Sequence, residues 1–194
     1  MVSFIYNIVH TYFHKMKDIL RRDIMVVHIK GRVVIICGPV SSGKSGLSRK
    51  IASAAPMNMG VVLPYTCMSK NGSKVLMEEK LKQQQAIGKA INKHEFVVID
   101  CEGVELEQLY ALVISIRIMG YQGTIDMVKM VLPKILHFSF FNNNRNKKKI
   151  SLERLKTERN AFKRVIEDEM TMNINEIKVV NPTEVTALSF EFEL

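Results

Sequence analysis

Lys44 and Ser45 stand directly after Gly43, and Gly38 lies five positions before that glycine. These four residues satisfy the pattern G-x-x-x-x-G-K-[ST] without a mismatch. In such a loop the glycines let backbone N–H groups turn toward an anion, and the N-terminus of the next helix adds partial positive charge. The lysine reaches the β- and γ-phosphates, and the serine hydroxyl binds Mg²⁺. The pattern predicts a nucleotide phosphate site.

The segments on either side of this pattern support the same prediction. Residues 33–37 form an apolar run typical of a buried strand, and residues 46–55 have the composition of the helix that should follow. We expect ATP, or another nucleoside triphosphate, together with Mg²⁺ as cofactors. The expected nucleotide-binding residues are Gly38, Pro39, Val40, Ser41, Ser42, Gly43, Lys44, Ser45 and Gly46.

Two carboxylates follow a second apolar run, at residues 96–99. The run ends in Asp100, and Glu102 stands two positions further on. A nucleotide-binding fold places its Mg²⁺ ligand or its catalytic base at the carboxyl end of a buried strand. Asp100 is therefore predicted to bind Mg²⁺ with Ser45 and to act in catalysis with Lys44. Glu102 is a candidate catalytic residue with three open roles, namely a water-activating glutamate, a substrate ligand or a solvated turn residue.

Positive charge is concentrated in residues 142–165. The chain has a formal net charge of +9, and in this stretch only Glu153 and Glu158 oppose the basic side chains. Three interpretations compete, namely a solvated basic face, a lid whose arginine stabilises the charge on a transferred phosphoryl group, and a surface for single-stranded nucleic acid. The last two can coexist. The basic residues are Arg145, Lys147, Lys148, Lys149, Arg154, Lys156, Arg159, Lys163 and Arg164.

Helical and strand patterns alternate along the rest of the chain. Helices are predicted over residues 74–92 and 106–119. Alternation of this kind predicts an α/β domain of the three-layer P-loop NTPase type, with a mostly parallel sheet and helices on both faces. We assign residues 25–194 to this domain. Strands are predicted over residues 61–63, 124–131 and 135–141, and two more, over 177–180 and 187–192, are expected to close or extend the sheet.

Residues 1–24 are predicted to be a separate amphipathic helical appendage. Apolar residues such as Val2, Ile5 and Val9 recur there at near-helical spacing, and basic residues gather toward the end. Polar residues interrupt any apolar core of a secretory signal. We expect residues 1–22 to contact the domain, a partner protein or a membrane surface.

The apolar runs and the cysteines indicate which cellular environment the protein occupies. The sequence lacks a run of about 18 uncharged apolar residues, so no transmembrane segment is predicted. Cys37, Cys67 and Cys101 are widely scattered and show neither metal-ligand spacing nor a secreted disulfide pattern. These cysteines favour a reducing, cytoplasmic compartment.

The order of these features resembles the kinase domains of the polynucleotide 5′-hydroxyl kinase and zeta-toxin-like group of P-loop phosphotransferases. The resemblance covers about residues 33–165. It rests on the glycine-rich pattern, on the segment AIGKAINKHEFVVID, and on the helix ISLERLKTERNAFKRV after an arginine-bearing loop. It implies that Lys44 and Ser45 hold ATP and Mg²⁺, and that Arg145 or Arg154 is the lid arginine.

One feature of that group has no counterpart in this chain. The group has a catalytic-base aspartate soon after the second strand, whereas residues 61–74 contain no carboxylate. A hydroxyl acceptor needs a proton acceptor within hydrogen-bond reach. Asp100 or Glu102 could take that role, or transfer activity has been lost. The sequence therefore predicts an ATP-dependent kinase acting on a hydroxyl of a nucleotide or polynucleotide. The alternative is a P-loop NTPase or nucleotide-binding scaffold module without transfer to an acceptor.

Overall fold

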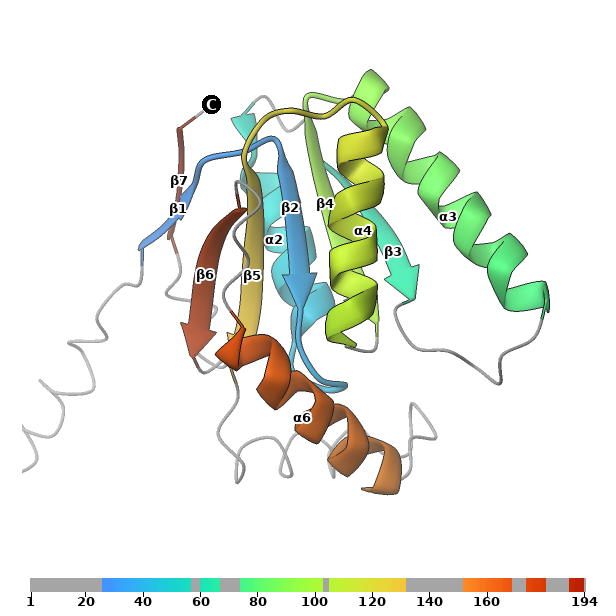
Figure 1. Ribbon diagram of the computed structural model, residues 1–194. Helices are drawn as coiled ribbons and strands as arrows, with labels where there is room; N and C mark the ends of the chain where they lie inside the picture. Colours follow the sequence, from blue (N-terminus) through green and yellow to red (C-terminus); the bar gives the residue numbers. More distant parts are fainter. Residues whose placement is uncertain are drawn as a thin grey trace, which may run out of the picture.

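The computed structural model describes residues 26–56, 60–66, 74–102, 105–131, 152–168, 174–180 and 189–193 (Figure 1). The predicted appendage at residues 1–24 lies outside these ranges, as do the predicted strand at 135–141 and Arg145. No helix within the described ranges is long and apolar enough to cross a membrane.

Five parallel strands form the main sheet, in the spatial order β3-β4-β2-β5-β6. The register aligns Ile36 of the central strand with Asp100 on one neighbour and Val128 on the other. The carboxyl ends of these strands therefore meet along one edge of the sheet. The strands are β2 Val33–Cys37, β3 Gly60–Thr66, β4 Phe96–Glu102, β5 Ile125–Val131 and β6 Ile174–Val180.

Helices cover both faces of this sheet (Figure 1). One face packs against α2, Lys44–Ala54, and the other against α3, Lys74–Lys93, α4, Leu106–Ile118, and α6, Leu152–Glu167. The side chains of β2 alternate between the two cores, because successive residues of a strand point to opposite faces. Ile35 and Cys37 pack in the core of α3, α4 and α6, whereas Val34 and Ile36 pack in the core of α2. The predicted three-layer α/β fold is confirmed.

The crossover from β2 runs on a different face from the crossovers of its neighbours. The helix after β2 lies on one face, while those after β4 and β5 lie on the other. The carboxyl end of β2 is therefore a topological switch point, the place where ligands bind in open α/β sheets. α6 lies across this edge of the sheet, below the loop from β2 to α2 (Figure 1).

The last strand departs from the prediction. β7, Ser189–Phe192, pairs in parallel with β1, Val26–Ile29, in a separate two-stranded sheet. The prediction that residues 187–192 close or extend the main sheet is wrong for the part that the structure describes. Phe190 and Phe192 pack instead on the core beside α2, and the ring of Phe192 meets that of Phe96 edge to face at 5.4 Å. Partial burial of these two aromatic side chains stabilises β7 in this position.

Candidate functional site

The glycine loop, residues 38–45, connects β2 to α2 at the switch point. α2 begins at Lys44, two residues before the predicted start, because Gly43 caps it in a left-handed conformation with φ 90° and ψ 5°. Ser41 is also left-handed, with φ 61°. A residue other than glycine pays roughly 1–2 kcal/mol for that conformation. Left-handed residues within a turn form the backbone nests that bind anions.

Gly38 lets the start of the loop approach β5. A Cβ atom at this position would lie 2.7 Å from Cβ of Met130 and 2.8 Å from Oγ of Ser42. Both distances are shorter than side chains tolerate, so a larger residue would push the loop away from the strand. The first glycine of the motif is required here for packing.

Lys44 folds back over the loop. Its side chain is buried, and Nζ donates a hydrogen bond to the carbonyl oxygen of Pro39 at 3.0 Å. The same carbonyl accepts a hydrogen bond from the backbone N–H of Ser42 at 3.2 Å. The ammonium group is therefore held within the loop, where its charge would act on a bound anion.

Two serine hydroxyls in the loop have unused hydrogen-bonding capacity. Oγ of Ser41 and Oγ of Ser42 are buried and have no hydrogen-bond partner within the described part of the chain. A buried polar group without a partner costs about 1–3 kcal/mol, so most such groups in folded proteins are paired. The first turn of α2 contains no acidic residue, and Gly43 supplies no side-chain cap. Hydroxyl donors, an ammonium group and an uncapped helix start together fit a phosphate group.

The two predicted carboxylates lie on β4, the strand beside β2. β4 extends through Asp100 and ends at Glu102, so both residues belong to the strand itself. Val98, two positions before Asp100, packs in the core of α2. By strand alternation, Asp100 and Glu102 lie on the face that α2 covers. Asp100 thus shares a sheet face with the first turn of α2, which carries Ser45.

The surroundings of the two carboxylates differ. Asp100 is half-buried, and its side chain makes no hydrogen bond or ion pair with another described residue. That leaves its oxygens available to a cation or to water. Glu102 is exposed and is aligned with Thr66 of the edge strand β3. All three of its predicted roles are compatible with this exposure.

A hollow lies between the glycine loop and α6. A cavity of about 280 Å³ is lined by Pro39 of the loop, Val131 at the end of β5, and a face of α6 that includes Arg159 and Lys163. Arg159 is half-buried there. Of the predicted lid arginines, Arg145 lies outside the described residues, and only the backbone of Arg154 is described. The structure therefore adds Arg159, which the sequence prediction did not single out, as the arginine beside the loop.

Glu158 is the other residue that the sequence prediction missed. It is only 1% exposed, and its Oε2 accepts a hydrogen bond from the backbone N–H of Val40 at 2.8 Å. The sequence carries a signal for this burial. Glu158 stands three positions after Leu155 and four before Phe162, both of which are buried, so it occupies the inward stripe of the helix.

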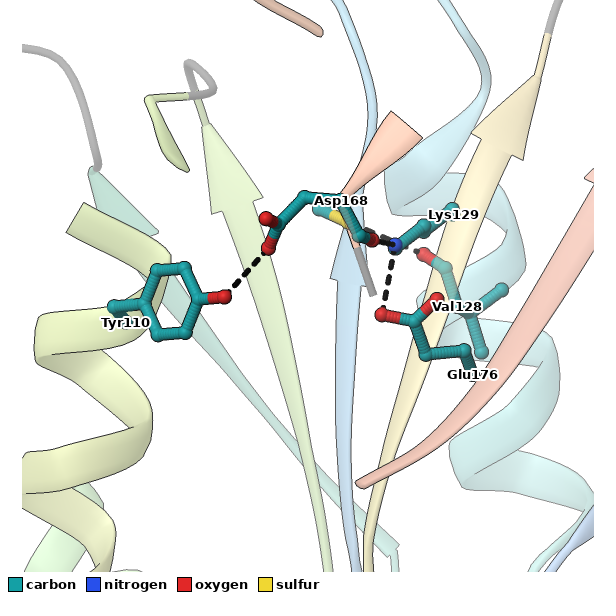
Figure 2. Close-up of polar contacts among 6 residues, drawn as sticks. Tyr110, Val128, Lys129, Asp168 and Glu176 are labelled. Carbon is teal, nitrogen blue, oxygen red and sulfur yellow. Dashed lines mark hydrogen bonds and ion pairs between the residues drawn. The ribbon is translucent and has the colours of Figure 1, made fainter. Parts of the chain in front are cut away.

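The C-terminal end of α6 is fixed by a separate polar network (Figure 2). Lys129 of β5 is fully buried, with Nζ 2.8 Å from Oε1 of Glu176 and 2.7 Å from the backbone carbonyl oxygen of Asp168. The Tyr110 hydroxyl of α4 donates to Oδ2 of Asp168 at 2.6 Å, and this hydrogen bond raises the pKa of Tyr110. The network joins the end of α6 to β5, β6 and α4.

Comparisons with known proteins give a fold likeness alone. The structure is similar to that of an unliganded sugar kinase from Janibacter sp. HTCC2649, with a TM-score of 0.45 and 11% sequence identity. The similarity covers 83% of this chain and 90% of the kinase. No protein-family model matches the chain, and no curated protein sequence matches it.

Proposed function

We propose that the protein binds a nucleoside triphosphate with Mg²⁺ at the glycine loop and transfers its terminal phosphoryl group to a hydroxyl of a nucleotide or polynucleotide. The observation that carries the proposal is the pair of buried, unpartnered hydroxyls of Ser41 and Ser42 beside the buried ammonium group of Lys44. A ligand that forms hydrogen bonds with such groups removes the energetic cost of leaving them unpaired. A phosphate offers the acceptor oxygens that they need.

Each part of the loop has a role in this reaction. Lys44 would bind the β- and γ-phosphates, and the Ser41 and Ser42 hydroxyls would donate to phosphate oxygens. Ser45 and Asp100 would hold Mg²⁺, which offsets the phosphate charge when it is bound. The described residues contain no cluster of three metal-binding side chains, so the ion would take its other ligands from phosphate and water.

The transfer step itself exchanges one bond for another. An oxygen of the acceptor hydroxyl forms a bond to the γ-phosphorus, the bond from that phosphorus to the β,γ-bridging oxygen breaks, and the diphosphate leaves. The hydroxyl proton passes to a carboxylate, for which Asp100 and Glu102 are the candidates. An arginine stabilises the charge of the transferring group. Arg159 joins Arg145 and Arg154 as a candidate, because it lines the cavity beside Pro39.

Two observations favour a second function. Residues 61–74 hold no carboxylate that could serve as the base near the second strand, and Glu102 at the end of β4 is exposed to solvent. A glutamate that faces water suits the activation of a water molecule. The alternative is therefore an NTPase or a nucleotide-binding module without a phosphoryl acceptor.

Radioactive transfer separates these functions. The protein is incubated with Mg²⁺ and γ-labelled ATP, alone, with nucleosides, and with a 5′-hydroxyl oligonucleotide. Label on an acceptor that is lost in Asp100→Asn supports the kinase. Label on the oligonucleotide alone would also support a nucleic-acid surface in residues 142–165, where the charge lies. Release of free phosphate at a rate that does not depend on any acceptor would instead support the NTPase. If neither a labelled acceptor nor free phosphate forms, both functions are contradicted.

A further inference from the structure

The glycine loop already has an anionic oxygen bound to one of its amides. The Glu158 carboxylate accepts the backbone N–H of Val40, a residue of the loop that is 118 positions away in sequence. Carboxylate and phosphate oxygens are chemically alike as acceptors, since both are anionic and both form charge-assisted hydrogen bonds with backbone N–H groups. Glu158 thus uses a donor of the kind that a phosphate-binding loop offers to its ligand.

A phosphate in this loop and the Glu158 carboxylate would repel each other. Glu158 is 1% exposed, so little water lies around it to screen its charge. Like charges interact more strongly in such surroundings than in bulk solvent. Bound phosphate and the Val40–Glu158 hydrogen bond therefore oppose one another.

The helix that carries Glu158 is anchored at its C-terminal end by buried polar contacts. At the C-terminal end, Asp168 is bonded to the fully buried Lys129 and to Tyr110 (Figure 2). Along the helix, Arg164 pairs with Glu107 of α4 at 2.9 Å, and both side chains are exposed, so this ion pair contributes little. Release of Glu158 would therefore remove one contact between the middle of α6 and the loop, while the C-terminal end of the helix stays anchored.

The neighbours of Glu158 on α6 give this contact a consequence. Arg159 and Lys163 line the cavity beside Pro39. Any movement of α6 away from the loop would change the position of these two cations relative to a bound phosphate. Occupancy of the loop and the shape of the cavity are thus coupled through one carboxylate.

We propose that Glu158 is an internal ligand of the glycine loop, which a bound phosphate must displace, and that it thereby sets the affinity of the loop for phosphates and the position of α6. This inference rests on the phosphate binding in the proposed function and does not require phosphoryl transfer. Glu158 is a positioning residue in this account, because it acts through the loop amide and through α6.

The test compares the full-length protein with Glu158→Gln and Glu158→Ala by titration calorimetry with Mg²⁺-ATP and with pyrophosphate. Glu158→Gln keeps the size of the side chain and an acceptor for the N–H of Val40 but removes the charge. It should therefore fold and remain measurable even if Glu158→Ala does not fold. The matched control is Glu153→Gln, an exposed acid of the same helix. We expect Kd for both ligands to fall about tenfold in Glu158→Gln, because a charge-assisted hydrogen bond to Val40 is exchanged for a neutral one. Kd should stay unchanged in the control.

Hydrogen exchange provides the second measurement. In the wild type, ATP should speed amide exchange in the middle of α6, and in Glu158→Gln that exchange should already be fast without ATP. An unchanged or higher Kd in folded Glu158→Gln would overturn the inference while leaving the proposed function intact. Failure of the wild type and every variant to bind either ligand would instead overturn the proposed function, and the inference with it.

Discussion

Buried polar groups occur at both ends of the main sheet, and their hydrogen bonding differs. At the amino end, Asp126 of β5 is fully buried and accepts hydrogen bonds from the backbone N–H of Gly31 at 2.6 Å and from Nδ2 of Asn175 at 2.6 Å. At the carboxyl end, the Ser41 and Ser42 hydroxyls are buried without a partner within the described residues. The first arrangement stabilises the fold, whereas the second leaves donors that pair with a ligand in the function proposed above.

A cavity larger than the one beside the glycine loop lies at the other end of the sheet. A hollow of about 360 Å³, lined in part by Arg32 and Tyr121, lies at the amino ends of the strands. The tyrosine hydroxyl in its lining is paired with the protein. The Tyr121 hydroxyl accepts from the backbone N–H of Arg32 at 3.1 Å and donates to the carbonyl of Thr124 at 2.9 Å. The smaller cavity beside the glycine loop adjoins unpaired donors, and we therefore place the site there.

The largest expected effect is on catalysis at the carboxyl end. Asp100→Asn keeps the size of the side chain and removes the charge that would hold Mg²⁺ or take a proton, so turnover should fall by about 10²–10⁴-fold. The free energy of unfolding should change little, because the carboxylate has no partner among the described residues. Turnover is measured by label transfer and stability by urea denaturation.

Glu102→Gln is the matched control for that change. A fall in turnover comparable to that of Asp100→Asn would identify Glu102 as a second participant. Wild-type turnover in Glu102→Gln would leave Asp100 as the strand-end carboxylate of the reaction. Wild-type turnover in Asp100→Asn would remove Asp100 from the site.

A smaller effect, on stability alone, is expected at the amino end. Asp126→Asn exchanges one acceptor oxygen for a donor that faces the N–H of Gly31 or the amide of Asn175. The free energy of unfolding should fall by about 2 kcal/mol, the scale of a buried polar group left unpaired. The affinity for ATP of the folded variant should be unchanged. A weakened affinity for ATP would show that the two ends are not independent.

The smallest expected effect is a pH dependence of the stability that Asp126→Asn removes. Burial is the largest influence on Asp126 and raises its pKa above the ordinary 3.8. The folded state therefore binds this proton more tightly than the unfolded state, so the contribution of Asp126 to stability falls as pH rises from 3.8 through the folded pKa. The difference between wild type and Asp126→Asn should shrink across that window and level off above it. A difference that grows with pH would contradict the cause assigned to the shift.

Local patterns in the sequence predicted the strand, loop and helix that carry the candidate site, because these elements are local in the chain. The strand, glycine loop and helix around Lys44 are consecutive, and Asp100 follows directly from an apolar run, so position and chemistry could be inferred together. Parallel pairing of β2 and β4 then brings Asp100 to the same edge as the loop. The backbone N–H of Val40 was expected at the site for the same reason.

Contacts between distant segments escaped prediction because no local pattern specifies them. Glu158 meets Val40 across 118 positions, and although its place between the buried Leu155 and Phe162 indicates burial, nothing near it in the sequence identifies Val40 as its partner. Lys129 lies in an apolar strand and gave no hint of its partner Glu176. The pairing of β1 with β7 likewise joins distant segments, and it depends on the packing of Phe190 and Phe192 against the core beside α2.

Thermal and chemical unfolding of Lys44→Ala with and without Mg²⁺-ATP tests the central claim most directly. At an ATP concentration of 100 times Kd, the wild type should gain about 2.7 kcal/mol in free energy of unfolding. Lys50→Ala, which removes an exposed lysine of the same helix, should gain as much. Lys44→Ala should gain nothing while its stability without ATP stays within about 1 kcal/mol of the wild type. A folded Lys44→Ala that ATP stabilises as fully as the wild type would contradict the assignment of the glycine loop as a phosphate site.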